Sequence, residues 1–109
     1  MTINKNIFTA TIIVAISLLA QSALAMDAAT LYRERTCIAC HGAEGKATVM
    51  DEYPKLAGQS ETYLLAQMKD IKSGARGNAH SPAMKNVMHL ISDKEMATIA
   101  SWLARLPEK

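Results

Sequence analysis

The sequence TCIACHG, residues 36–42, holds the only two cysteines of the chain and places a histidine directly after the second. Cys37 and Cys40 are separated by two residues, and His41 completes a Cys-x-x-Cys-His pattern. Thiols and an imidazole this close together serve three kinds of site: a redox-active disulfide, a zinc site or a covalently attached haem. The rest of the sequence has to distinguish between these three.

The disulfide and the zinc site both lack support from the surrounding sequence. A thioredoxin-like Cys-x-x-Cys motif belongs to a βαβ unit, and the neighbouring residues show no strand pattern. A zinc site would use Cys37, Cys40 and His41, with His80 or His89 as the fourth ligand. Structural zinc sites usually pair two spaced couples of ligands, however, and adjacent cysteine and histidine residues make an awkward chelate.

The third interpretation explains the motif directly, because Cys-x-x-Cys-His is the attachment signature of a c-type haem. Positions three apart lie on one face of a helical turn, so Cys37 and Cys40 can reach two vinyl groups of one porphyrin. His41 then falls under the iron as its proximal ligand. The sequence predicts one covalent haem c per chain.

The beginning of the chain has the three regions of a secretory signal peptide. Lys5 supplies a positive charge, an apolar run extends from residue 7 to residue 20, and residues 23–25 form a small-x-small cleavage site. A membrane anchor is the alternative, but this run is shorter than the roughly 20 residues of a spanning helix. We predict a removed signal peptide at residues 1–25, one domain at residues 26–109, and export to the periplasm as a soluble protein.

Charge and size limit both the function and the core. The 109 residues include 12 basic and 10 acidic side chains, which is close to neutral. Nucleic-acid binding requires a clear basic excess, so this balance argues against a nucleic-acid partner. A domain this short buries little core, and a Cys-x-x-Cys disulfide closes too small a loop to stabilise it much. A large buried cofactor would supply the missing core.

Helix signals dominate the remaining chain. Asp27 is a suitable N-cap for a first helix that continues toward the cysteines. Residues 60–73 have apolar residues at helical spacing and are followed by Gly74, a typical stop signal.

Two further helices are expected near the end of the chain. A short helical turn is predicted to begin at Ser81 and Pro82, with the serine as cap. Ser92 and Glu95 form the capping-box pattern of a last helix, which Pro107 ends.

Four segments together resemble a class I monohaem cytochrome c of the small bacterial periplasmic type: LYRERTCIACHG, YPKLAGQSETYLLAQMKDIKSGARG, SPAM and ISDKEMATIASWLARL. The resemblance covers nearly all of residues 27–106, and the order of haem motif, methionine and C-terminal helix also agrees. It implies an all-α fold in which the first and last helices cross and the haem is held between loops.

The sixth iron ligand has to be chosen among several methionines. Met68 and Met96 lie on helical apolar stripes and are expected in the core. Met84 and Met88 lie four apart on one face. The resemblance implies Met84, which precedes the last helix by a spacing similar to that of the family's axial methionine, with Met88 as the alternative. The other candidates are Met50, His80 and His89, the two histidines being expected as exposed loop residues.

The resemblance also assigns residues around the haem. Pro54 matches the proline whose backbone carbonyl accepts a hydrogen bond from the proximal histidine. Leu56 resembles a residue that packs on the haem, and Arg76 resembles positions near the haem propionates. Core positions are predicted for Tyr63, Leu64 and Trp102.

Ligation by histidine and methionine leaves the iron no free site and favours the reduced state. The sequence therefore predicts a one-electron carrier, not an enzyme on its own, that exchanges electrons with donor and acceptor proteins or serves as the haem subunit of an oxidoreductase. The alternatives are a haem sensor or peroxidase-like protein with a displaceable sixth ligand, and a zinc or dithiol module without haem.

Overall fold

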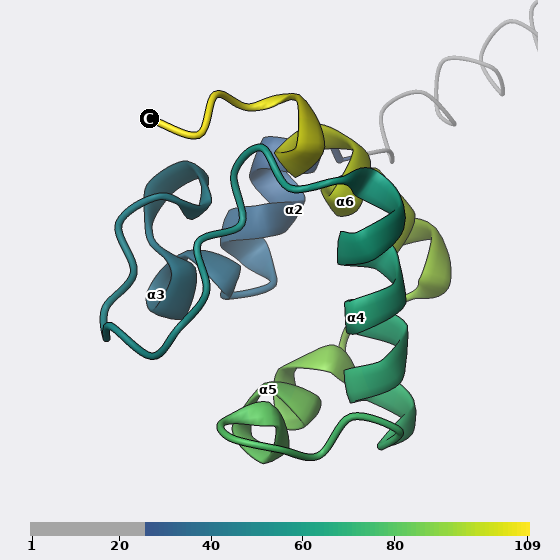
Figure 1. Cartoon of the computed structure of the whole chain (residues 1–109). Helices are drawn as coiled ribbons and strands as arrows, with labels where there is room; N and C mark the ends of the chain where they lie inside the picture. Colours follow the sequence, from purple (N-terminus) through teal and green to yellow (C-terminus); the bar gives the residue numbers. More distant parts are fainter. Residues whose placement is uncertain (1–25) are drawn as a thin grey trace, which may run out of the picture.

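The computed structural model describes residues 26–109, and the signal peptide predicted at residues 1–25 lies outside them. The described residues are helical and contain no strand, which confirms the predicted all-α class. In chain order the elements are α2 (Ala28–Glu34), α3 (Cys37–His41), the short 3-10 helix η1 (Ala43–Gly45), α4 (Glu61–Ser73), α5 (Ser81–Met88) and α6 (Asp93–Arg105) (Figure 1).

Helices α4 and α6 lie where the sequence predicts them. The Ser60 side chain accepts a hydrogen bond from a backbone N–H of the first turn of α4, and Gly74 ends that helix at φ 89°. Ser92 caps α6 in the same way by accepting from the backbone N–H of Glu95. Helix α6 ends at Arg105, just before Pro107. Both helices thus begin with the side-chain caps that their sequences indicate.

The first helix is shorter than predicted. Asp27 caps α2 by accepting from the backbone N–H of Thr30, but the helix ends at Glu34 and does not continue into the cysteines. Thr36 has φ 64°, a left-handed conformation that residues other than glycine rarely adopt. This residue turns the chain, so the cysteine motif forms a helix of its own, α3.

Helix α5 is a full helix of eight residues, and its predicted cap is wrong by one position. His80 is the N-cap, Ser81 is the first helical residue and Pro82 is the second. A proline is tolerated there because the first N–H groups of a helix have no partner within it. The His80 side chain makes no capping hydrogen bond.

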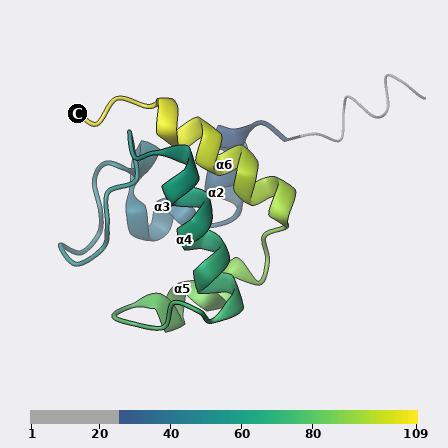
Figure 2. The same cartoon turned by 45° about the vertical axis from the view of Figure 1, so that its right-hand side comes forward.

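Helix α6 forms the centre of the core, with α2 and α4 packed against it (Figures 1 and 2). The crossing of α2 and α6 is the one that the resemblance implies. At this crossing Tyr32 packs on the partly buried Trp102, with 5.3 Å between the two ring centroids. The core predictions for Leu64, Met68 and Met96 are confirmed. The prediction for Tyr63 is wrong, because its side chain is 53% exposed.

An ion pair fastens the end of α2 to the start of α6. The Arg35 guanidinium donates two hydrogen bonds to the Glu95 carboxylate, at 2.7 and 3.1 Å. This bidentate geometry favours the charged carboxylate, and the hydrogen bond from Arg35 holds the pKa of Glu95 below its usual value.

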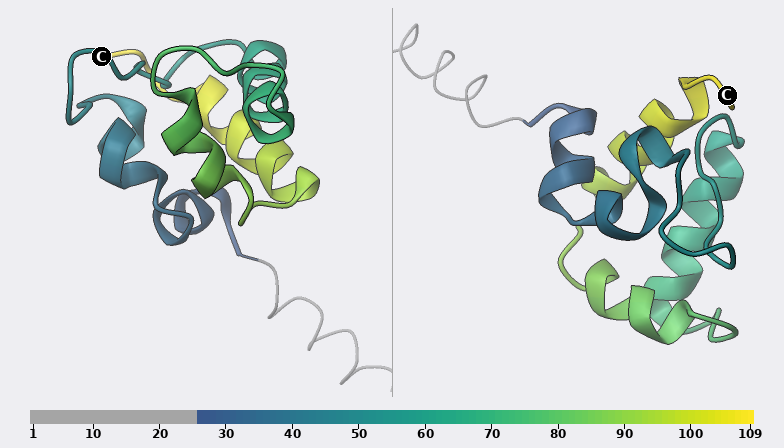
Figure 3. Two further views of the ribbon diagram at one scale, coloured as in Figure 1. Left: turned by 90° about the horizontal axis from the view of Figure 1, so that it is seen from below. Right: turned by 90° about the vertical axis from the view of Figure 1, so that its left-hand side faces the viewer.

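The loops place α3 and α5 apart from one another around the α4–α6 pair (Figure 3). Residues 42–60 return from α3 to α4, and residues 74–80 lead from α4 to α5. Among residues 26–109, no helix has the length and apolar character needed to cross a bilayer.

Candidate functional site

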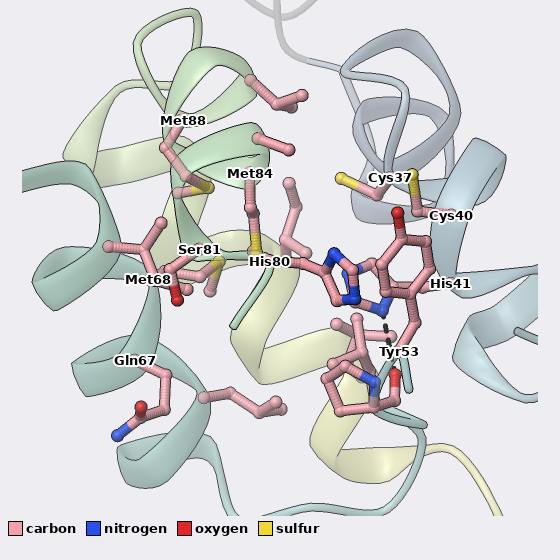
Figure 4. A pocket seen from close by; sticks show the side chains of 18 of the residues that line it. Cys37, Cys40, His41, Tyr53, Gln67, Met68, His80, Ser81, Met84 and Met88 are labelled. Carbon is pink, nitrogen blue, oxygen red and sulfur yellow. Dashed lines mark hydrogen bonds between the residues drawn. The ribbon is translucent and has the colours of Figure 1, made fainter. Parts of the chain in front are cut away.

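A single cavity brings together side chains from α2, α3, α4, α5, α6 and both long loops (Figure 4). Its lining includes Cys37, Cys40 and His41 from α3 and Met84 and Met88 from α5. The sequence-predicted residues Pro54, Leu56 and Arg76 line it as well. The cavity therefore collects every residue that the sequence analysis assigned to the site.

The two thiols lie at the α3 side of this cavity, three positions apart on one short helix. No disulfide joins the two thiols in the structure. Burial raises the pKa of the Cys37 thiol to about 11, while Cys40 is exposed. Among residues 26–109 no three His, Cys, Asp or Glu side chains cluster as a metal site would require.

His41 is buried and is held by one hydrogen bond. Its Nδ1 lies 2.9 Å from the carbonyl oxygen of Pro54. A carbonyl only accepts, so Nδ1 carries the proton and donates, and the lone pair of the neutral ring remains on Nε2. Burial lowers the pKa of His41, and the bond to Pro54 opposes that lowering. The ring is thus fixed in the tautomer that a metal-binding imidazole needs.

Backbone contacts hold the loop that carries Pro54. The carbonyl oxygen of Gly45 accepts from the backbone N–H of Leu56 at 2.8 Å, which joins η1 to this loop. The hydroxyl of Tyr32 donates to the carbonyl oxygen of Gly42 at 2.7 Å, which ties the end of α3 to α2. These bonds fix the backbone that directly follows His41 and the loop that carries Pro54.

The opposite wall of the cavity is lined by thioethers. Met84 is partly buried, and Figure 4 shows its side chain pointing into the space toward the His41 side. Met88, one turn further along α5, is 1% exposed and belongs to the buried core cluster. Met68 of α4 also lines the cavity from the core.

The rim of the cavity is polar and aromatic. The Arg76 guanidinium donates to the side chains of Gln67 and Asn78, at 3.1 and 3.2 Å. Tyr53 meets His80 edge-on, with 5.1 Å between ring centroids. These contacts order the side chains at the opening of the cavity.

The Cytochrome c family model matches residues 25–107. The chain belongs to the cytochrome c family. As a cytochrome c with a single Cys-x-x-Cys-His motif, it carries one covalently bound haem c, attached at the motif formed by Cys37, Cys40 and His41.

Individual relatives support this assignment over different lengths. Cytochrome c-553 of Nitratidesulfovibrio vulgaris is 32% identical over 85 residues, which are 78% of this chain and 81% of the relative. Cytochrome c4 of Azotobacter vinelandii is 35% identical over 105 residues, 91% of this chain but 49% of the relative. The thiosulfate dehydrogenase electron acceptor of Stutzerimonas stutzeri is 34% identical over 101 residues, 86% of this chain and 45% of the relative. The chain thus spans about a third to a half of the length of relatives of the latter two kinds.

The residues of the cavity fit the haem of a cytochrome c. Two thiols, an imidazole nitrogen and a thioether supply the attachment points and soft ligands that an iron porphyrin uses. Ser81 adds an independent observation: its hydroxyl is buried in the lining and has no hydrogen-bond partner within the described part of the chain. A buried hydroxyl without a partner is costly, so a polar group of a bound molecule is the expected partner.

Tyr53, Gln67 and Ser81 are among the lining residues of this cytochrome that sequence reasoning did not assign to the site. Tyr53 directly precedes Pro54, and this position could have indicated that it lies near the haem. Gln67 is one residue before the core position Met68, and nothing in the helical pattern indicated that its amide would hold an arginine. Ser81 was interpreted only as a helix cap.

Proposed function

We propose that this protein is a periplasmic one-electron carrier whose haem iron is ligated by His41 and Met84. The observation that carries the proposal is the arrangement of one cavity: an imidazole fixed by a backbone carbonyl, two thiols three positions apart on one helix, and a thioether directed into the same space (Figure 4). Bound haem would supply one-electron chemistry by cycling between its ferric and ferrous states.

The chain's own residues hold and shield the group. Cys37 and Cys40 anchor it from α3, His41 offers Nε2, and Met84 offers its sulfur from α5. With His41 and Met84 both bound to the iron, no coordination site would be left for a substrate. A thioether ligand favours the reduced state, which suits a carrier that accepts and donates single electrons.

Residues around these ligands set the environment. Leu56 contributes apolar surface next to the core, and the guanidinium of Arg76, ordered by Gln67, offers a positive charge for the haem carboxylates. The Ser81 hydroxyl provides a buried hydrogen-bond donor. Water exclusion by the apolar lining strengthens each of these electrostatic contacts.

Met84 is a better ligand candidate than Met88 because of where each side chain lies. Met88 is nearly inaccessible and packs in the core cluster, whereas Met84 is only partly buried and points into the cavity. Using Met88 would remove core packing from α5. Met88 is therefore assigned to the core.

We infer that the partners are a donor and an acceptor protein and that the chain transforms no substrate on its own. One relative is named as the electron acceptor of thiosulfate dehydrogenase, which supports a role beside an oxidoreductase, as a free carrier or as its haem subunit. The signal peptide predicted at residues 1–25 supports an exchange in the periplasm.

The experiment is a set of visible and near-infrared spectra of purified wild type, Met84→Ala and Met88→Ala. The wild type is expected to be red, to keep its haem mass after denaturation, and to show the methionine–ferric charge-transfer band. Only Met84→Ala should lose this band. Loss of the band in Met88→Ala alone would refute the ligand assignment, rapid carbon monoxide binding by the reduced wild type would favour a sensor, and a colourless protein would refute the haem.

A further inference from the structure

His80 lies beside the proposed axial methionine on the same side of α5. It is the N-cap residue, and its carbonyl oxygen accepts from the backbone N–H of Met84 at 3.3 Å. Residues joined in this way lie one helical turn apart on one face. Both side chains line the cavity, and Figure 4 shows the His80 ring in the same space as the side chains of Met84 and His41.

Tyr53 connects the two imidazoles of the cavity. Its ring centroid lies 5.1 Å from that of His80, at an interplanar angle of 90°, and 6.3 Å from that of His41. Both histidines therefore pack against one aromatic ring at the opening. This contact directs His80 inward, although the residue is exposed and was expected to be a loop histidine without a role.

Of the helices α4, α5 and α6, only α5 begins without a side-chain cap. Ser60 and Ser92 cap α4 and α6 with side-chain hydrogen bonds, whereas His80 makes none at α5. The residue before it, Ala79, has φ 50°, a left-handed conformation that costs a non-glycine residue about 1 kcal/mol or more. Rearranging the first turn of α5 therefore gives up no side-chain cap and releases local strain.

We propose that His80 is a reserve ligand that takes the sixth coordination position when the Met84 sulfur leaves it. The exchange replaces one lone-pair donor by another: the bond from iron to sulfur breaks, a bond from iron to the neutral imidazole nitrogen forms, and no electron or proton is transferred. The inference rests on the proposed function, since it presupposes that Met84 is the sixth ligand.

Such an exchange has two physical consequences. The iron remains six-coordinate, so small molecules still find no open position. An imidazole does not favour the reduced state as a thioether does, so the histidine-ligated form has a lower potential and is a poorer electron acceptor. The protein would thus have a second, low-potential state built into the same helix.

The test compares four holoproteins: wild type, Met84→Ala, Met84→Ala with His80→Ala, and Met84→Ala with His89→Ala. His89 is the matched control, because it is an exposed histidine at the other end of α5 that does not line the cavity. Absorption spectra report the spin state of the ferric form, and stopped-flow mixing with carbon monoxide reports access to the ferrous iron.

Met84→Ala is expected to lose the methionine band yet remain low-spin, with a carbon monoxide rate that does not depend on its concentration, because His80 must first dissociate. Adding His80→Ala should give a high-spin spectrum and at least tenfold faster binding that rises with carbon monoxide concentration. Adding His89→Ala should change neither property.

Three results would overturn the proposal, and they separate it from the assignment of Met84. A Met84→Ala protein that is already high-spin, or a low-spin one that His80→Ala does not alter, refutes the role of His80 alone. Retention of the methionine band in Met84→Ala refutes both assignments. Should Met84→Ala yield no holoprotein, Met84→Leu, which conserves side-chain volume, is the second background for the same comparison.

Discussion

Replacing Gly42 by alanine should destabilise the protein severely, because this residue follows His41 in a conformation that only glycine adopts readily. Its φ of 78° and ψ of 174° lie outside the regions open to other residues, at a cost of about 1–3 kcal/mol for a side chain. A Cβ atom at this position would also lie 2.0 Å from the carbonyl oxygen of Ala47. That neighbour is backbone and cannot move aside as a side chain could.

Relief of this collision requires the segment between α3 and residue 47 to shift. The shift breaks two hydrogen bonds to the Gly42 carbonyl oxygen, from the Tyr32 hydroxyl at 2.7 Å and from the Gly45 N–H at 3.1 Å. Each is worth about 0.5–1.5 kcal/mol. Together with the conformational cost, we expect the free energy of unfolding of Gly42→Ala to fall by about 2–6 kcal/mol.

Urea unfolding of the holoprotein, followed by far-ultraviolet circular dichroism, measures this loss. Gly77→Ala is the matched control, because a Cβ atom there meets nothing within 4 Å. The control should change the free energy of unfolding by no more than about 1 kcal/mol in either direction. Equal unfolding midpoints for Gly42→Ala and wild type would show that the backbone around His41 is not constrained as described.

Three further changes probe the core, an ion pair and a partly buried hydrogen bond. Met88→Ala should lower the free energy of unfolding by about 2–5 kcal/mol in urea titrations, because it leaves a cavity where a 1% exposed side chain packs; a loss below 1 kcal/mol would contradict its place in the core. Glu95→Gln should destabilise the protein at neutral pH, because Arg35 lowers the pKa of this carboxyl. The difference from wild type should shrink as pH falls below the ordinary value of 4.5 and through the lower folded value, and a difference independent of pH would refute it. Tyr32→Phe should cost about 1–2 kcal/mol, since it leaves the Gly42 carbonyl oxygen with one partner fewer; thermal unfolding measures the loss, and an unchanged midpoint would argue against that bond.

The sequence was most informative where the chemistry allows few residue types. Cysteine and histidine at fixed spacing identify the haem attachment site without any structure, and serine caps with apolar stripes locate α4 and α6. Those signals are local, so they survive in the folded chain. The same local logic found Asp27 as the start of α2.

The errors came from features that no local pattern encodes. Thr36 adopts a left-handed conformation that its type does not favour, so the break between α2 and α3 was not predictable. Tyr63 lies one position from the buried stripe of α4, and the rotation of about 100° per residue turns it outward. Met84 and Met88 share one face of α5, so periodicity alone cannot separate them, and their different burial in the fold supports the proposal of Met84.

The two sides of the cavity are secured by different means, and this difference determines where ligand exchange is expected. On one side, His41 is fixed by the Pro54 carbonyl. The loop that carries Pro54 is held in turn by the backbone N–H of Leu56, which donates to the carbonyl oxygen of Gly45. On the other side, Met84 is carried by a helix whose start has no side-chain cap and whose first turn presents a second donor, His80. Because a ligand leaves most readily where its support rearranges at least cost, the imidazole of His41 should remain bound while the opposite position changes.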